Sequence, residues 1–119
     1  MQQTLILQSV PERLNKLFTM HRMARYAYKK QVMEEVGWEV KAQKIKAVKG
    51  PVILQFVLTF SKKRNRDKDN YLGGLKFVID GLKDAGIIKD DNSDIVQSIN
   101  CAFAINDKKE TRIMICELE

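Results

Sequence analysis

Acidic and basic side chains alternate over a short stretch near the middle of the chain, Arg64-Asn65-Arg66-Asp67-Lys68-Asp69-Asn70. A second pair of acids, Asp90-Asp91, follows after a helix-like segment and a turn. Carboxylates are the ligands that a hard divalent cation needs, and arginine is the side chain best shaped to hold phosphate. Metal ligands and phosphate ligands placed side by side are typical of phosphodiester chemistry.

These acids predict a metal site. Asp67 and Asp69 would share one side of an extended segment, because residues two apart point to the same face. With Asp91 as a third carboxylate and Asp90 beside it, the site would be rich in oxygen, as Mg²⁺ or Mn²⁺ prefers. The alternative is that Asp67, Asp69 and Asn70 cap the next helix and that the later acids form ordinary turns. The neighbouring arginines, a lysine on the polar helix face and the second acidic pair favour the metal site.

Basic residues are concentrated in the first part of the chain. Residues 1–66 hold 14 Lys and Arg against 4 Asp and Glu, whereas residues 67–119 hold 7 against 11. Such a distribution predicts contact with a polyanion. Arg22, Arg25 and Lys29 fall on one face of a predicted helix, where they would follow a phosphate backbone or simply solvate that face. The predicted DNA-binding residues are Arg22, Arg25, Lys29, Lys62, Lys63, Arg64 and Arg66.

Hydrophobic periodicity predicts the elements that must position these residues. The expected order is a strand at 4–8, a helix at about 20–40, a strand at 52–60, a helix at about 74–85, and strands at 95–105 and 111–118. The strand at 52–60 should be central, and the last two strands should pair as an antiparallel hairpin. Trp38 is expected in the core. This order, β-α-β-α-β-β, predicts an α+β class and a single domain, 1–119, with one mixed sheet covered by helices.

The position of Asp91 depends on the segment that follows the second helix. Gly86 is placed to end that helix, and residues 86–91 are just long enough to return along it if they are nearly extended. We therefore expect Ile87-Ile88 to pack antiparallel to the helix and to bring Asp91 to the carboxylates of its own subunit. The alternative is delivery to the site of a partner subunit.

Composition excludes several classes of protein. No stretch is long and uncharged enough to cross a membrane, and the N-terminus lacks the pattern of a secretory signal, so a cytoplasmic protein is expected. Cys101 and Cys116 lie in apolar runs with a single histidine, His21, in the chain, which predicts buried thiols rather than a zinc site. No small-molecule cofactor is expected.

Three motifs together resemble the signature of the RusA-type Holliday junction resolvases, a family common in prophages. They are Arg66-Asp67-x-Asp69-Asn70, Lys76-x-x-x-Asp80 and Ala85-Gly86-x-x-x-Asp90-Asp91. The looser similarity of Asn15-Lys16-Leu17 and the order of elements extend the resemblance over most of the chain. Lys76 follows Asn70 at a longer spacing than in the family, and Gly73-Gly74 would let the helix begin late and absorb the difference.

The resemblance implies a homodimeric, Mg²⁺-dependent endonuclease that cuts four-way DNA junctions by symmetric nicking, in recombination and repair. It implies metal binding by Asp67, Asp69 and Asp91, with Asp90 as an acidic neighbour, and a catalytic role for Lys76. Lys76 has a simpler alternative, an i,i+4 ion pair with Asp80. Two other functions stay open: a DNA-binding module without catalysis, and a metal-dependent nuclease that acts on flaps or single strands.

Overall fold

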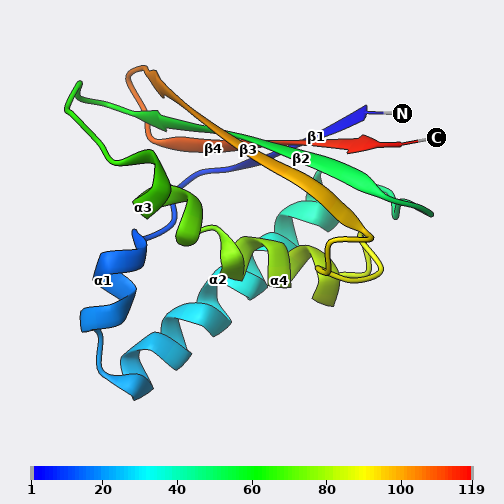
Figure 1. The fold of residues 1–119 in the computed structure, drawn as a ribbon, viewed down its shortest axis with the longest axis horizontal. Helices are drawn as coiled ribbons and strands as arrows, with labels where there is room; N and C mark the ends of the chain where they lie inside the picture. Colours follow the sequence, from blue (N-terminus) through cyan, green and yellow to red (C-terminus); the bar gives the residue numbers. More distant parts are fainter. Residues whose placement is uncertain (1, 119) are drawn as a thin grey trace.

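The computed structural model describes residues 2–118, which form one mixed four-stranded sheet with the helices gathered on one side of it (Figure 1). The α+β class and the single mixed sheet predicted from the sequence are confirmed. None of the described helices has the length and apolar content needed to span a membrane. In chain order the elements are β1 (Gln2–Leu7), α1 (Leu14–Thr19), α2 (Arg22–Ala42), β2 (Val52–Phe60), α3 (Lys68–Gly73), α4 (Lys76–Asp84), β3 (Val96–Ile105) and β4 (Glu110–Glu117).

The strand order in the sheet is β1-β4-β2-β3. β2 pairs with β3 in parallel and with β4 antiparallel, so its predicted interior position is confirmed. The predicted β3–β4 hairpin is wrong, because β2 lies between these two strands. Burial gives the reason: Ile113 and Ile115 of β4 are completely or almost completely buried, whereas Ile99 and Ile105 of β3 are 37% and 52% exposed. The more apolar strand takes an interior place, and β3 takes an edge.

One face of β2 forms the centre of the core. Val52, Leu54, Phe56 and Leu58 alternate along the strand and are fully buried, as residues of one strand face must be when helices cover that face. Helices α2 and α4 pack closely where Gly81 meets Val36, because the glycine has no side chain. A Cβ added at Gly81 would collide with Val36. The strand therefore has a fixed position, and so does the loop that leaves it.

Helix α2 begins and ends close to the predicted limits. His21 caps its first turn by accepting a hydrogen bond from the backbone N–H of Met23. At the other end the Gln43 side chain bonds both the N–H and the carbonyl of Ile6, which ties the helix to β1. The predicted core position of Trp38 is wrong, since this side chain is 75% exposed. Val36 is buried, and residues two apart on a helix do not share a face.

The second helix predicted at about 74–85 is present as α4, and a division in the chain separates it from α3, a helix that was not predicted. The division lies at Gly73-Gly74, where a side chain on Gly73 would collide with Leu14 and one on Gly74 with the backbone carbonyl of Glu12. Helix α4 therefore begins late, at Lys76, as the spacing after Asn70 suggested. It ends near Gly86, whose φ of 77° is the left-handed conformation expected of a glycine at a helix C-terminus.

Candidate nucleic-acid interface

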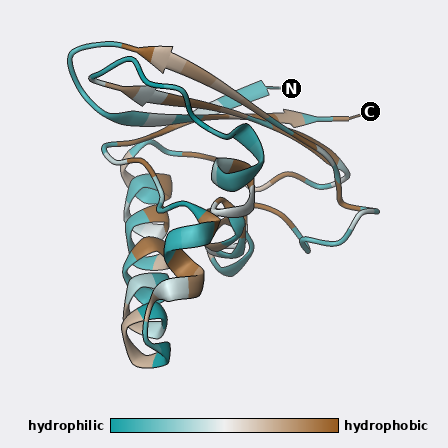
Figure 2. Ribbon diagram, turned by 60° about the vertical axis from the view of Figure 1, so that its left-hand side comes forward, coloured by the Kyte–Doolittle hydropathy of each residue, from teal (hydrophilic) through white to brown (hydrophobic). Residues whose placement is uncertain are grey.

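A polar hollow of about 660 Å³ lies where β2 ends. Its basic residues come from three separate parts of the chain: Arg13 precedes α1, Lys62, Arg64 and Arg66 follow β2, and Lys109 lies in the β3–β4 turn. The loop after β2 and the β3–β4 turn lie at the same end of the sheet (Figure 1), and both are hydrophilic (Figure 2). Five cationic side chains thus line one concave surface, which we call the basic hollow.

Most of these cations have no acidic partner. Among residues 2–118, none of the ion pairs includes Arg13, Lys62, Arg64 or Lys109. The acidic group that lines the hollow is Asp67. A concentration of unpaired positive charge in a concave surface attracts an anion such as a phosphate group.

Aromatic side chains hold the hollow in shape. Phe60, Tyr71 and Phe103 pack edge to face, with ring centres 5.3–5.7 Å apart, and so fasten α3 to β2 and β3. The guanidinium of Arg66 lies 3.7 Å from the centre of the Phe60 ring and donates a hydrogen bond to the Lys62 carbonyl. Arg66 therefore shapes the loop after β2, and leaves Arg64 and Lys62 exposed.

Asp67 and Asp69 lie at the start of α3 rather than in an extended segment. Asp67 caps the helix, and its carboxylate accepts a hydrogen bond of 3.0 Å from the backbone N–H of Asp69. The expectation that the two acids share one side of an extended segment is wrong, because Asp69 is in the first helical turn. Asn70 accepts a hydrogen bond of 2.9 Å from the N–H of Asn15 and so connects α3 with α1. The capping alternative is present, and the Asp69 carboxylate is exposed.

Asp91 lies beside α4, and within residues 2–118 it forms no metal-binding cluster with Asp67 and Asp69, to which it was predicted to be brought. Its carboxylate lies 3.7 Å from Nζ of Lys76 and 3.9 Å from Nζ of Lys83, two lysines on one face of that helix. The chain thus returns along α4, although it does so through bends at 87–89 rather than in extended form. The return is possible because α4 has nine residues and spans only about 14 Å.

An ion-pair ladder runs along α4. Its members are Lys29, Asp80, Lys76, Asp91, Lys83 and Asp90, each within 4 Å of the next. Lys76 contacts both Asp80, as the simpler alternative predicted, and Asp91. Within this ladder acidic and basic charges largely compensate one another.

The strongest perturbation of an acid falls on Asp90. A hydrogen bond from the backbone N–H of Asp91, and a second bond from Lys83, lower the pKa of Asp90 to about 2. The same contact with Asp90 raises the pKa of Lys83. Asp90 also accepts a hydrogen bond from the side chain of Asn92, so it forms part of an ordered turn.

The predicted basic stripe on α2 divides in two. Arg22 is exposed and Arg25 is half-buried, and among residues 2–118 neither takes part in an ion pair. Lys29 instead lies 3.8 Å from Asp80 and over the ring of Phe77. Of the three, Arg22 and Arg25 are the side chains whose charge is not already paired with an acid and is available to an external anion.

The structure brings the predicted basic residues together better than the predicted acids. Lys62, Arg64 and Arg66 line the hollow, and Lys63 is exposed beside it. By contrast, no group of three or more His, Cys, Asp or Glu residues in the described range 2–118 is arranged to hold a metal ion. The sequence analysis missed Arg13 and Lys109, which are far from the loop in sequence. Lys109 could have been predicted only from the pairing of β4 with β2, which brings the β3–β4 turn to the end of β2.

Comparisons with models of protein families and with curated proteins gave no match.

Proposed function

We propose that this protein is a structure-specific endodeoxyribonuclease that acts on four-way DNA junctions with Mg²⁺. The observation that carries the proposal is the basic hollow, with Asp67 at its lining and Asp69 two residues beyond. The resemblance of the motifs around Asp67, Lys76 and Asp91 to the RusA-type resolvases supports the choice of substrate. The proposed setting is the cytoplasm, and the proposed assembly is a homodimer.

The hollow would hold the phosphate backbone beside the acids. Arg64 and Lys62 extend from a loop whose base is fixed by β2. Binding of phosphate oxygens by these two side chains would therefore cost little backbone entropy. Arg13 and Lys109 would contact the same strand from the other elements that line the hollow. This arrangement would place a phosphodiester next to Asp67.

The acid residues are chemically suited to Mg²⁺, although they are not gathered into one site. Mg²⁺ is commonly bound by one or two carboxylates together with substrate phosphates and water, so a preformed cluster of three acids is not required. Asp67 and Asp69 would provide the carboxylates, and the ion would supply charge neutralisation and an activated water. Asp91 and Asp90 would stay bound to lysines of the ladder unless DNA binding rearranges that loop.

Lys76 would act on the charge that develops during cleavage. It is 67% exposed, and its ion pairs with Asp80 and Asp91 are 3.6 and 3.7 Å long. Exposed pairs of this kind are weak, so the ammonium group can exchange a carboxylate for a phosphate oxygen. Stabilising a transition-state anion is the role that such a cation serves best.

One observation favours a second function, a DNA-binding module without catalysis. Asp67 caps α3, and Asp90 and Asp91 are engaged in a turn and in ion pairs. Acids in such positions have a sufficient structural reason to be present. In that case the basic hollow would bind DNA and no bond would be cut.

The deciding experiment is a cleavage assay on a synthetic four-way junction, with fork, flap and linear duplex of matched length as controls. The proposal expects paired nicks in opposed strands of the junction with Mg²⁺ or Mn²⁺, and none with a chelator. Binding without nicking under any metal would establish the binding module. Nicking of flaps or single strands in preference to the junction would establish the other nuclease class.

A further inference from the structure

Helix α2 carries two exposed aromatic side chains that the proposed function does not use. Trp38 is 75% exposed, and Tyr26, on the same helix, is 66% exposed. Both side chains line a hollow of about 860 Å³, a volume within the range of small-ligand sites. Large aromatic side chains left exposed around a hollow indicate a surface that another molecule covers.

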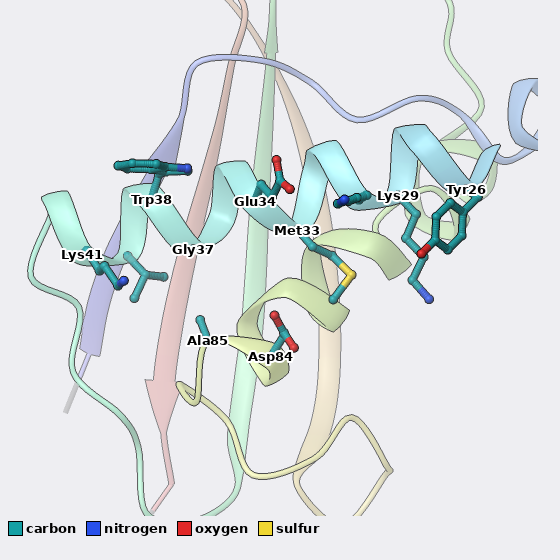
Figure 3. Close-up of a pocket in the computed structure, with 11 residues that line it drawn as sticks. Tyr26, Lys29, Met33, Glu34, Gly37, Trp38, Lys41, Asp84 and Ala85 are labelled. Carbon is teal, nitrogen blue, oxygen red and sulfur yellow. The ribbon is translucent and has the colours of Figure 1, made fainter. Parts of the chain in front are cut away.

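The hollow lies between α2 and the end of α4. On the α2 side Gly37 leaves space, because a side chain added there would meet nothing within 4 Å. Asp84 and Ala85, at the end of α4, lie across from α2 (Figure 3). The space beside Trp38 is therefore open to a flat group from outside.

The charged residues that line this hollow are of two kinds. Lys29 is held by the ladder, whereas Lys30 and Lys41 are exposed and belong to no ion pair among residues 2–118. Glu34 and Asp84 are likewise exposed and outside every ion pair of that range. Lysine binds phosphate, and carboxylates accept hydrogen bonds from the amino groups of nucleobases. A ligand that matches both kinds carries anionic groups and neutral amino donors in one molecule.

A run of lysines continues from the hollow into the segment before β2. Residues 41–49, which we call the lysine loop, contain four exposed lysines and no acid: Lys41, Lys44, Lys46 and Lys49. None of the four forms an ion pair within residues 2–118. The loop is ordered, because the Gln3 side chain bonds both the N–H and the carbonyl of Lys46. A fixed line of uncompensated positive charge beside an aromatic hollow matches a phosphate backbone.

Lys44 has a backbone conformation that lysine rarely adopts. Its φ of 57° is left-handed, at the position after a helix where glycine is the usual residue. The N–H of Lys44 donates to the Lys41 carbonyl, and the N–H of Ile45 donates to the Val40 carbonyl, so the helix end fixes this conformation. A charged side chain retained at a strained position indicates that the charge has a use.

We propose that single-stranded DNA binds here, with one unpaired base stacked on Trp38 in the hollow and the adjoining phosphates on the lysine loop. Aromatic stacking beside a cationic path is how proteins hold single strands. Glu34 and Asp84 accept hydrogen bonds from the amino group of the base, which disfavours thymine because thymine has no amino group. An acidic peptide is a poorer match, because its own carboxylates would meet Glu34 and Asp84.

This site is separate from the basic hollow. The lysine loop precedes β2 and the basic hollow follows it, and a nine-residue strand spans roughly 30 Å. One subunit could thus hold a duplex backbone at one end of β2 and an unpaired strand at the other. The inference goes beyond the proposed function and rests on it only for the choice of DNA as the ligand. Binding at Trp38 requires neither metal nor cleavage.

Trp38 is its own probe, because it is the single tryptophan of the chain. Without metal, an oligodeoxycytidylate of about ten nucleotides, a usual site size for single-strand binding, should quench its emission. Oligothymidylate of the same length should bind at least about fivefold more weakly, the effect of one lost hydrogen bond to the base. A strand of abasic nucleotides should not quench, and linear duplex should bind at the basic hollow without quenching.

Two variants separate stacking from charge. Trp38→Ala should lower the affinity for labelled oligodeoxycytidylate by about 5–100-fold, as the loss of one stacked base does, and Trp38→Phe should restore most of it. Lys44→Gly should reduce the slope of log affinity against log salt by about 0.7, the value for one phosphate of a single strand. It should also raise the thermal denaturation midpoint, because glycine adopts the left-handed conformation without strain.

Met23→Ala is the matched control for the aromatic variants. Met23 is an exposed apolar residue of α2 that lies outside the hollow, so this variant should bind single strands normally. The affinity for linear duplex should be the same in all these variants, and circular dichroism verifies that each is folded.

The assignment is overturned if oligodeoxycytidylate leaves the Trp38 emission unchanged, or if Trp38→Ala binds it normally. It is also overturned if oligothymidylate, the abasic strand or an oligoglutamate binds as tightly, since the base and its amino group would then not be recognised. These outcomes are separate from failure of the proposed function. Quenching by single strands without junction cleavage leaves this site intact, and junction cleavage without quenching removes this site alone.

Discussion

The basic hollow and the ion-pair ladder contain the same kinds of residue in opposite arrangements. In the ladder Lys76, Lys83 and Lys29 are each within 4 Å of a carboxylate. In the hollow Arg64 and Lys62 have no such partner among residues 2–118. The difference teaches that the number of charges in a region does not decide where a polyanion binds. On the proposed function, the charges that remain uncompensated are the ones that would attract the polyanion.

The largest effect is expected at the edge of the hollow. Asp69→Asn should lower the rate of junction cleavage by more than the roughly 10–100-fold typical of residues that only orient a metal ligand. Binding should be unchanged or tighter, because the substitution also removes a negative charge near phosphate. Asp94→Asn, an exposed acid in the turn before β3, is the matched control and should cut normally. Wild-type cleavage by Asp69→Asn would remove this residue from the site.

The segment that connects the two regions should be sensitive to added volume. Gly74→Ala should lower the free energy of unfolding by about 1–3 kcal/mol, as overpacking of a close contact does. The added Cβ would collide with the carbonyl of Glu12. Gly50→Ala meets only ordinary contact at 4.0 Å and should change stability far less. Equal thermal denaturation midpoints for the two variants would contradict the close packing of this junction.

Substitution of two lysines of the ladder, Lys76 and Lys83, should have different effects on cleavage. Lys76→Met should change the free energy of unfolding by less than about 1 kcal/mol, because its ion pairs are long and exposed. If Lys76 contacts the reacting phosphate, its loss should also reduce the rate of cleavage with little change in junction affinity. Lys83→Met should reduce neither the rate of cleavage nor the affinity for the junction. Equal cleavage rates for the two variants would make Lys76 another member of the ladder.

The smallest effect concerns the titration of Asp90. Its folded-state pKa of about 2 is below the ordinary 3.8, so the fold favours the ionised form. Its contribution to stability is therefore fully present above about pH 4 and is lost as the pH falls through about 2. Carboxyl NMR shifts should show this low midpoint, and Lys83→Met should raise it. An Asp90 that titrates near 3.8 would mean that the turn is not ordered in solution.

The helices and strands themselves were predicted better from the sequence than which of them lie side by side. The alternation of β2 and the periodicity of α2 are local patterns, and both elements are present close to the expected limits. The pairing of β3 with β2 depends on competition between strands for the centre of the sheet, which no local pattern records. Trp38 was misplaced for a related reason, because hydrophobicity alone does not say which face of a helix is covered.

The same limit applies to the candidate site. Lys62, Arg64 and Arg66 were found because they are consecutive with a predicted strand. Arg13 and Lys109 were missed because only the tertiary fold brings them to the hollow. The helical start at Lys68 also changed the relation between Asp67 and Asp69, since a cap and a first turn use the same residue types as a metal site.

The central claim is that the DNA backbone is held by the unpaired cations of the basic hollow and not by Lys83, which the ladder pairs with acids. Its most direct test compares Arg64→Ala with Lys83→Ala, two variants that each lose one positive charge. Affinity for a four-way junction should be measured over a range of salt concentrations without divalent metal. Arg64→Ala should reduce the slope of log affinity against log salt by about 0.9, the value for one phosphate contact, and Lys83→Ala should leave the slope unchanged. A reduced slope for Lys83→Ala with a normal slope for Arg64→Ala would contradict the claim.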